Sequence, residues 1–150
     1  FPEVLHDGRR GVAGDFQEGW IGFSGMDSLL FSVTLNDKTL AQTFEVGFCH
    51  HPNDWVLMPE NVEIQWSADN VVWSDWHTLR QLTTLQDLET DCLRTRWQYG
   101  FTKEDFKGKQ KKGLRYLRMR IRCSNPLPVW HPYFGKPAWT MIDEITVKSN

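Results

Sequence analysis

The feature that most constrains the fold of this chain is an alternation of apolar and polar side chains with a period of two. In 114–123, for example, Leu117 and Met119 alternate with Arg118 and Arg120. Successive side chains of a strand point to opposite faces of a sheet, so this alternation predicts strands with one face on a core and one in water. The strict segments are residues 43–49, 61–67 and 114–123, and weaker strand candidates are 29–35, 76–82 and 141–147.

Turn-forming residues separate these segments. They include Asn36-Asp37, Pro52-Asn53-Asp54, Asp69-Asn70 and the stretch from Gly108 to Gly113. No stretch has a convincing helical period, although 82–91 has room for a turn or two. Short antiparallel strands joined by long loops are typical of a β-sandwich or jelly roll. A length of 150 residues fits one such domain, spanning 1–150.

The charge balance argues against two classes of partner. Seventeen basic and nineteen acidic residues give a net charge of -2, so nothing global attracts the chain to nucleic acid or to an anionic membrane. No apolar run approaches the roughly 18 residues of a membrane span. We also find no run of Leu, Ile or Met at a loop tip, which argues against membrane insertion.

One local run departs from this balance. Residues 103–122 carry nine Lys and Arg, and we interpret them as solvated surface; the alternative is a site for phosphate or sulfate. The three cysteines, Cys49, Cys92 and Cys123, lack C-x-x-C spacing and are odd in number. We expect three small buried apolar side chains, with one disulfide as the alternative.

The usual catalytic motifs are missing. The sequence has no G-x-S-x-G, no phosphate-binding loop of the G-x-x-x-x-G-K-[ST] type, no G-x-G-x-x-G and no H-E-x-x-H. His50 and His51 are adjacent, as are Asp143 and Glu144, and neighbouring strand residues diverge to opposite faces. A binding module is therefore favoured over an enzyme.

Several stretches together resemble a known family. They are 5–27 (LHDGRRGVAGDFQEGWIGFSGMD), 55–73 (WVLMPENVEIQWSADNVVW), 115–123 (RYLRMRIRC) and 128–147 (PVWHPYFGKPAWTMIDEITV). In this order they resemble the discoidin (coagulation factor type C) group of galactose-binding-like β-sandwiches. The similarity is greatest to the C-terminal domain of bacterial family 20 β-N-acetylhexosaminidases, also called chitobiases. It extends from Leu5 to Val147.

The resemblance implies a galactose-binding-like jelly roll of about eight antiparallel strands with a carbohydrate-related role. It implies that this chain, which starts at Phe1 without Met or signal, is a non-catalytic C-terminal fragment of a secreted, periplasmic or cell-surface glycoside hydrolase. The implied partners are a galactose- or N-acetylhexosamine-containing glycan and the catalytic domain of the parent chain. The alternative function is a discoidin-type protein-interaction or cell-surface adhesion module. A third hypothesis is an enzyme with a carboxylate pair or His-Cys pair in a pocket.

Modules of this fold often hold a structural Ca²⁺ between the first long loop and the last strand. By position, the resemblance assigns the carboxylates of Asp7 and Glu144, with the backbone carbonyls of Val4, Arg9 and Val12. The alternative is that Asp7 caps a turn with Gly8, while Glu144 pairs with Arg9 or Arg10.

Aromatic residues divide into two groups. Trp20, Trp66, Trp73 and Trp139 are expected in the core. Others lie near turn or loop chemistry, namely Trp55, Trp97, Tyr99, Trp130 and Tyr133.

Aromatic faces beside hydrogen-bonding side chains suit sugar binding, because a ring stacks on the apolar face of a pyranose while polar groups bind its hydroxyls. The segments 49–55 and 129–135 have this mixture. The expected carbohydrate site comprises His50, His51, Asn53, Trp55, Trp130, His131 and Tyr133, with Arg94 and Arg96 as outer candidates. The alternative is a secondary core under a long loop, or packing against the catalytic domain.

Overall fold

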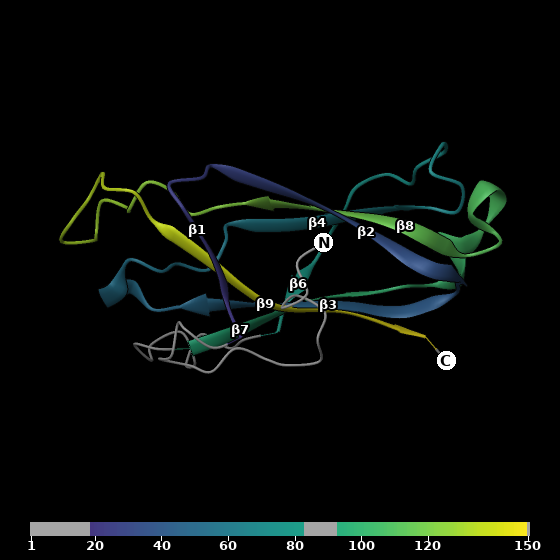
Figure 1. Ribbon diagram of the computed structural model, residues 1–150, viewed down its shortest axis with the longest axis horizontal. Helices are drawn as coiled ribbons and strands as arrows, with labels where there is room; N and C mark the ends of the chain where they lie inside the picture. Colours follow the sequence, from purple (N-terminus) through teal and green to yellow (C-terminus); the bar gives the residue numbers. More distant parts are fainter. Residues whose placement is uncertain (1–18, 83–92, 150) are drawn as a thin grey trace.

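The computed structural model describes residues 19–82 and 93–149, and it is an all-β sandwich (Figure 1). Nine strands in the described residues form two antiparallel sheets, with the orders β1-β9-β3-β7-β6 and β2-β8-β4-β5. The predicted class, a sandwich of about eight antiparallel strands, is confirmed. Within the described ranges, no helix is long and apolar enough to cross a membrane.

The five-stranded sheet contains β1 (Ile21–Ser24), β9 (Trp139–Ser149), β3 (Ala41–His50), β7 (Leu93–Gly100) and β6 (Arg80–Gln81). The four-stranded sheet contains β2 (Ser28–Thr39), β8 (Leu114–Arg122), β4 (Asn61–Ser67) and β5 (His77–Thr78). Three short 3-10 turns in the described residues are η2 (Pro52–Asp54), η3 (Lys103–Phe106) and η4 (Gly108–Gln110).

All three strictly alternating segments form strands, as β3, β4 and β8, and the candidates 29–35 and 141–147 lie within the longer β2 and β9. The candidate 76–82 instead divides into β5 and β6, which belong to different sheets on either side of buried Leu79. The suggested turn at 82–91 lies almost entirely outside the described residues.

The strands β1 and β7 are not predicted, and β7 corrects a specific expectation. Trp97 and Tyr99 do not lie in a loop, because both are strand residues paired with Val46 and Phe44 of β3. The inward positions of β7 include a fully buried Thr95, which hides the apolar alternation.

The core lies between the sheets. Its fully buried side chains come mainly from β3, β4 and β8, and they include Phe44, Phe48, Ile64, Trp66, Leu117, Met119 and Ile121. Burying each such side chain stabilises the fold by about 1.5–3 kcal/mol relative to leaving it exposed. Cys49 and Cys123 are also buried, as expected, and burial raises the pKa of the Cys123 thiol. Cys92 lies outside the described residues.

The expectation for the four core tryptophans is confirmed for Trp20 and Trp66, which are buried. It is wrong for Trp139, whose side chain is 38% exposed. Trp139 is the first residue of β9, and its ring lies over Gly22 at the end of the sheet rather than between the sheets. The expectation is also wrong for Trp73, which is partly buried on the outer face of the other sheet, under the guanidinium of Arg118 at 3.9 Å from the ring centroid.

The outer faces of the two sheets differ in their burial. Arg118 and Arg120 of β8 lie on a solvent-facing surface, where the second guanidinium lies 4.1 Å from the ring of Trp76. In β3 the outer face is buried too, and an ion pair between Arg94 of β7 and Asp143 of β9 crosses over Gly47. A Cβ atom at position 47 would overlap both side chains, so glycine is required there.

Candidate functional site

Two loops meet at one end of the sandwich, one following β3 and one preceding β9. Trp139 donates its N–H to the carbonyl of Trp55 at 2.8 Å, and Leu57 donates to the carbonyl of Trp139 at 3.0 Å. Beneath the loops, Leu57, Leu127 and Ala138 form a small apolar cluster that is separate from the main core. These contacts hold the loops in fixed positions relative to the strands.

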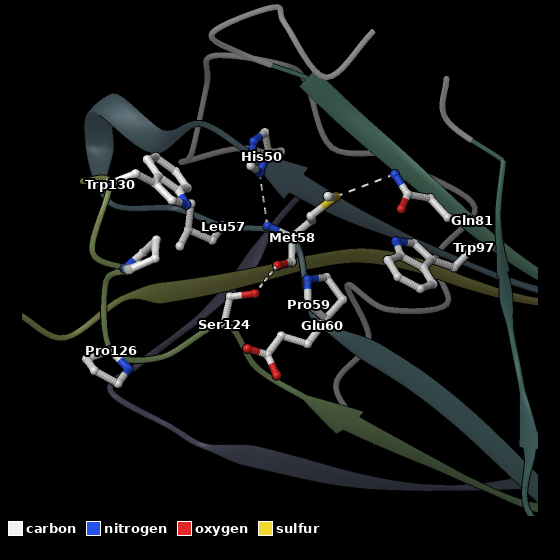
Figure 2. Close-up of a pocket in the computed structure, with 11 residues that line it drawn as sticks. His50, Leu57, Met58, Pro59, Glu60, Gln81, Trp97, Ser124, Pro126 and Trp130 are labelled. Carbon is white, nitrogen blue, oxygen red and sulfur yellow. Dashed lines mark hydrogen bonds between the residues drawn. The ribbon is translucent and has the colours of Figure 1, made fainter. Parts of the chain in front are cut away.

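A cavity of about 440 Å³ opens at this end (Figure 2). This volume falls in the range of roughly 300–1,000 Å³ that is usual for small-molecule sites. The described residues that line it are His50, Leu57, Met58, Pro59, Glu60, Gln81, Trp97, Ser124, Pro126, Pro128 and Trp130. They come from β3, β6, β7 and the segments that lead into β4 and out of β8.

Met58 is the residue around which this wall is organised (Figure 2). Its backbone N–H donates to Nδ1 of His50 at 3.3 Å, and its carbonyl accepts from the hydroxyl of Ser124 at 2.8 Å. The amide of Gln81 contacts its sulfur at 3.5 Å. Three polar side chains are thereby oriented by one residue, which preorganises the wall before any ligand arrives.

The bond to Met58 also determines what His50 can offer. Burial lowers the pKa of His50 below its ordinary value, and neighbouring His51 lowers it further. The imidazole is therefore neutral at physiological pH. Because Nδ1 accepts a hydrogen bond, the single ring proton lies on Nε2, so the ring has one N–H left to donate.

The remaining lining residues combine aromatic surface with one charge. Trp97 is buried, and its indole N–H donates to Oγ1 of Thr95 at 3.3 Å; Trp130 is 63% exposed at the rim. Glu60 is the one formally charged residue among the described residues that line the cavity. This arrangement can bind a small polyhydroxylated ligand with an apolar face and without negative charge.

The structure brings the predicted loop residues to the same end of the molecule but gives them different roles. Only His50 and Trp130 of that set line the cavity within the described ranges. Asn53 is exposed in η2, and Nδ1 of His51 lies 2.8 Å from a carboxylate oxygen of Asp54.

The other three residues connect the two loops. His131 is buried, and its Nε2 lies 2.7 Å from the carbonyl of Pro52. Trp55 packs on the small apolar cluster and against Tyr133, with 5.2 Å between ring centroids. Trp55 and His131 therefore match the alternative given above for the loop residues, in which they pack beneath the loop instead of lining a sugar site. Tyr133 remains 57% exposed.

The outer candidates Arg94 and Arg96 are engaged elsewhere. Arg94 pairs with Asp143, and Nε of Arg96 lies 3.4 Å from a carboxylate oxygen of Glu45, both on the outer face of the five-stranded sheet. Neither arginine is among the described residues that line the cavity.

The calcium prediction falls largely outside the described residues. Asp7 and the carbonyls of Val4, Arg9 and Val12 all lie there, whereas Glu144 is a half-buried residue of β9. Among the described residues, no group of three His, Cys, Asp or Glu side chains could hold a metal ion. Calcium prefers six to eight oxygen ligands, so Glu144 alone makes no site, and the calcium stays a prediction.

Sequence reasoning missed Glu60, Gln81 and Ser124 as lining residues. Each is a single polar residue at the edge of a strand, and they are brought together only by the sheet pairings. The one available signal was Pro59-Glu60, which directly precedes the alternating segment 61–67. No family model and no curated protein matches the chain, so the family resemblance remains an expectation.

Proposed function

We propose that this chain is a non-catalytic carbohydrate-binding domain of a secreted, periplasmic or cell-surface glycan-degrading enzyme of the chitobiase type. The observation that carries the proposal is the cavity in which Trp97 and Trp130 lie beside the hydrogen-bonding groups of His50, Glu60 and Gln81. The ligand would be a neutral galactose- or N-acetylhexosamine-containing glycan.

The chemistry of the wall supports a neutral sugar. The carboxylate of Glu60 accepts hydrogen bonds from hydroxyl or amide N–H groups, while the Nε2–H of His50 donates to a hydroxyl or acetamido oxygen. Indole surface at Trp130 suits the apolar face of the sugar ring. A sugar acid would bring a second negative charge beside Glu60 without a cation among the described lining residues.

A non-catalytic role fits the carboxylates that the structure describes. Asp143, the first residue of the acidic pair Asp143-Glu144, is fully buried and bound by Arg94. A general acid must reach its substrate, which this carboxylate does not. Catalysis would belong to a separate domain of the parent chain, and the isolated chain should release no product from a chromogenic N-acetylglucosaminide.

Isothermal titration with galactose, N-acetylglucosamine and chitin oligomers tests the proposal. We expect a dissociation constant of about 1 mM, because a small open site offers few contacts. Trp130→Ala should weaken binding about tenfold by removing the stacking surface. Phe134→Ala is the matched control, since Phe134 is 62% exposed on the same loop but is not among the described lining residues. Absence of heat with every sugar would contradict the proposal.

A second candidate function rests on the loop itself. Val129, Trp130, Tyr133 and Phe134 are each more than half exposed, so this loop has an apolar tip although it contains no run of Leu, Ile or Met. Ordered apolar tips mark interaction surfaces, so a discoidin-type protein-interaction or adhesion module is the alternative.

Binding of the labelled chain to intact cells separates the two functions. Protease treatment of the cells, or Val129→Ser with Phe134→Ser, would abolish binding through the apolar tip. Competition by free N-acetylglucosamine would instead support the glycan proposal.

A further inference from the structure

We propose that a second cavity, at the opposite end of the sandwich, binds a carboxylate-bearing sugar such as a uronic acid. The cavity has a volume of about 480 Å³. Its described lining residues are Leu40, Ala41, Gln42, Phe101, Thr102, Lys103, Phe106 and Lys111. Ala41 begins β3, whereas His50, which lines the first cavity, ends it, so the two sites are separated by roughly 30 Å.

The charges of this cavity are the reverse of those of the first. Lys103 and Lys111 line it, and no carboxylate is among the described lining residues. Within the described part of the chain, neither lysine forms an ion pair, whereas Nζ of nearby Lys107 lies 2.7 Å from a carboxylate oxygen of Glu104. Two ammonium groups at one cavity favour an anionic ligand.

The basic run 103–122 is therefore not a uniform solvated surface. Arg118 and Arg120 are held on the four-stranded sheet by Trp73 and Trp76, and Nε of Arg115 donates to the carbonyl of Leu35 at 3.2 Å. These arginines lie on the sheet and do not line the cavity. Among the described lining residues, the basic ones are Lys103 and Lys111.

The apolar part of the lining indicates a ring-bearing ligand rather than a bare anion. Phe101 and Phe106 are stacked at 5.5 Å between centroids, and exposed Leu40 lies beside them. A pyranose has an apolar face that fits such a surface. The amide of Gln42 can donate to or accept from its hydroxyls, and the hydroxyl of Thr102, which donates to Asp105 at 3.4 Å, can still accept a hydrogen bond.

The wall is held in place by backbone and capping contacts. The N–H of Phe101 donates to the carbonyl of Gln42 at 2.8 Å, which ties the 101–106 segment to the start of β3. A carboxylate oxygen of Asp105 accepts the N–H of Thr102 at 2.8 Å, so η3 begins at a fixed position. The two carboxylates that follow Lys103 in the sequence are thus engaged, Asp105 in capping and Glu104 in the ion pair with Lys107.

The test is titration of the intact chain with glucuronate, with glucose and sulfate as separate ligands. We expect binding of glucuronate, no measurable binding of glucose at this cavity, and weaker binding of sulfate. Lys103→Gln with Lys111→Gln should lower the affinity for glucuronate about tenfold, since charge-assisted hydrogen bonds are lost. Lys109→Gln with Lys112→Gln removes the same charge from residues outside the described lining and should change the affinity less than twofold.

The outcomes are decisive. Equal affinities for sulfate and glucuronate, or equal losses in the two double variants, would show general attraction of anions and overturn the proposal. Absence of glucuronate binding would overturn it as well. Because neutral sugars and Trp130→Ala report on the other cavity, failure here is distinguishable from failure of the proposed function.

Discussion

The aromatic residues near the two ends of β3 differ in whether they pack against the main core. At the lysine-bearing end, Phe101 and Phe106 pack against the main core, and the ring of Phe101 lies 4.9 Å from that of buried Trp66. At the His50 end, Trp130 lies in solvent above a small separate apolar cluster. The first end is therefore part of the structure that holds the sheets together, while the second is a loop added to it. Substitutions should separate these roles.

The largest expected effect is on stability at the lysine-bearing end. Trp66→Ala should lower the free energy of unfolding by about 3–5 kcal/mol, because it empties the centre of an aromatic cluster within the main core. Chemical denaturation measures this. Trp130→Ala, as the exposed counterpart, should change it by less than about 0.5 kcal/mol. Similar losses in the two variants would contradict the distinction between the ends.

A smaller effect is expected beneath the loop. Leu127→Ala should lower the free energy of unfolding by about 2–3 kcal/mol. This is at the lower end of the losses for a buried leucine, because its cluster contains few residues and can relax. The same variant should weaken binding of N-acetylglucosamine while leaving glucuronate binding unchanged. Titration of both sugars measures this, and a loss at both ends would show that the loop cluster is coupled to the whole fold.

Removal of the Tyr99 hydroxyl at the lysine-bearing end should lower the free energy of unfolding by about 1 kcal/mol. Tyr99 donates to both carboxylate oxygens of Asp105, at 3.1 Å and 3.0 Å, and its pKa is raised by burial and by this carboxylate. Tyr99→Phe leaves Asp105 with its bond from Thr102 but without this donor. Thermal unfolding measures the loss, and an unchanged midpoint would show that water replaces the hydroxyl.

The smallest effect is that of pH at the His50 end. The pKa of His50 is lowered in the folded state, so the unfolded chain binds more protons below the ordinary pKa of about 6.5. Its contribution to stability is therefore complete above that pH and decreases as pH falls through the lowered pKa.

Protonation of Nδ1 also removes the acceptor for the N–H of Met58, so binding of a neutral sugar should weaken on acidification. Glucuronate binding between Lys103 and Lys111 should not change over the same range, because lysines stay charged. Titrations at two pH values measure both. His50→Gln is the control that should remove the pH dependence.

Much of the fold is predictable from the alternation in β3, β4 and β8, because the inward positions of these strands are large and apolar. β7 is not recognised, since Thr95 occupies an inward position and the arginines beside it resemble a loop rather than a strand. The position of Trp139 is mispredicted for the opposite reason. A tryptophan is large and apolar and is therefore expected in the core, but this one is the first residue of β9 and lies outside the core.

The candidate site is predictable only in part. His50 and Trp130 follow from the mixture of aromatic and polar residues in their segments. The roles of His51 and His131 depend on partners such as Asp54 and the carbonyl of Pro52, which no spacing reveals. Glu60 becomes a lining residue only through the arrangement of the strands around it.

The crossing of Arg94 and Asp143 over Gly47 limits the order in which this sequence can change. Any larger residue at position 47 is excluded while both long side chains are present. Shortening either member first would remove an ion pair whose carboxylate is fully buried, which is costly. Positions 47, 94 and 143 would therefore have to change nearly together, so we expect them to be substituted more slowly during evolution than the residues around them.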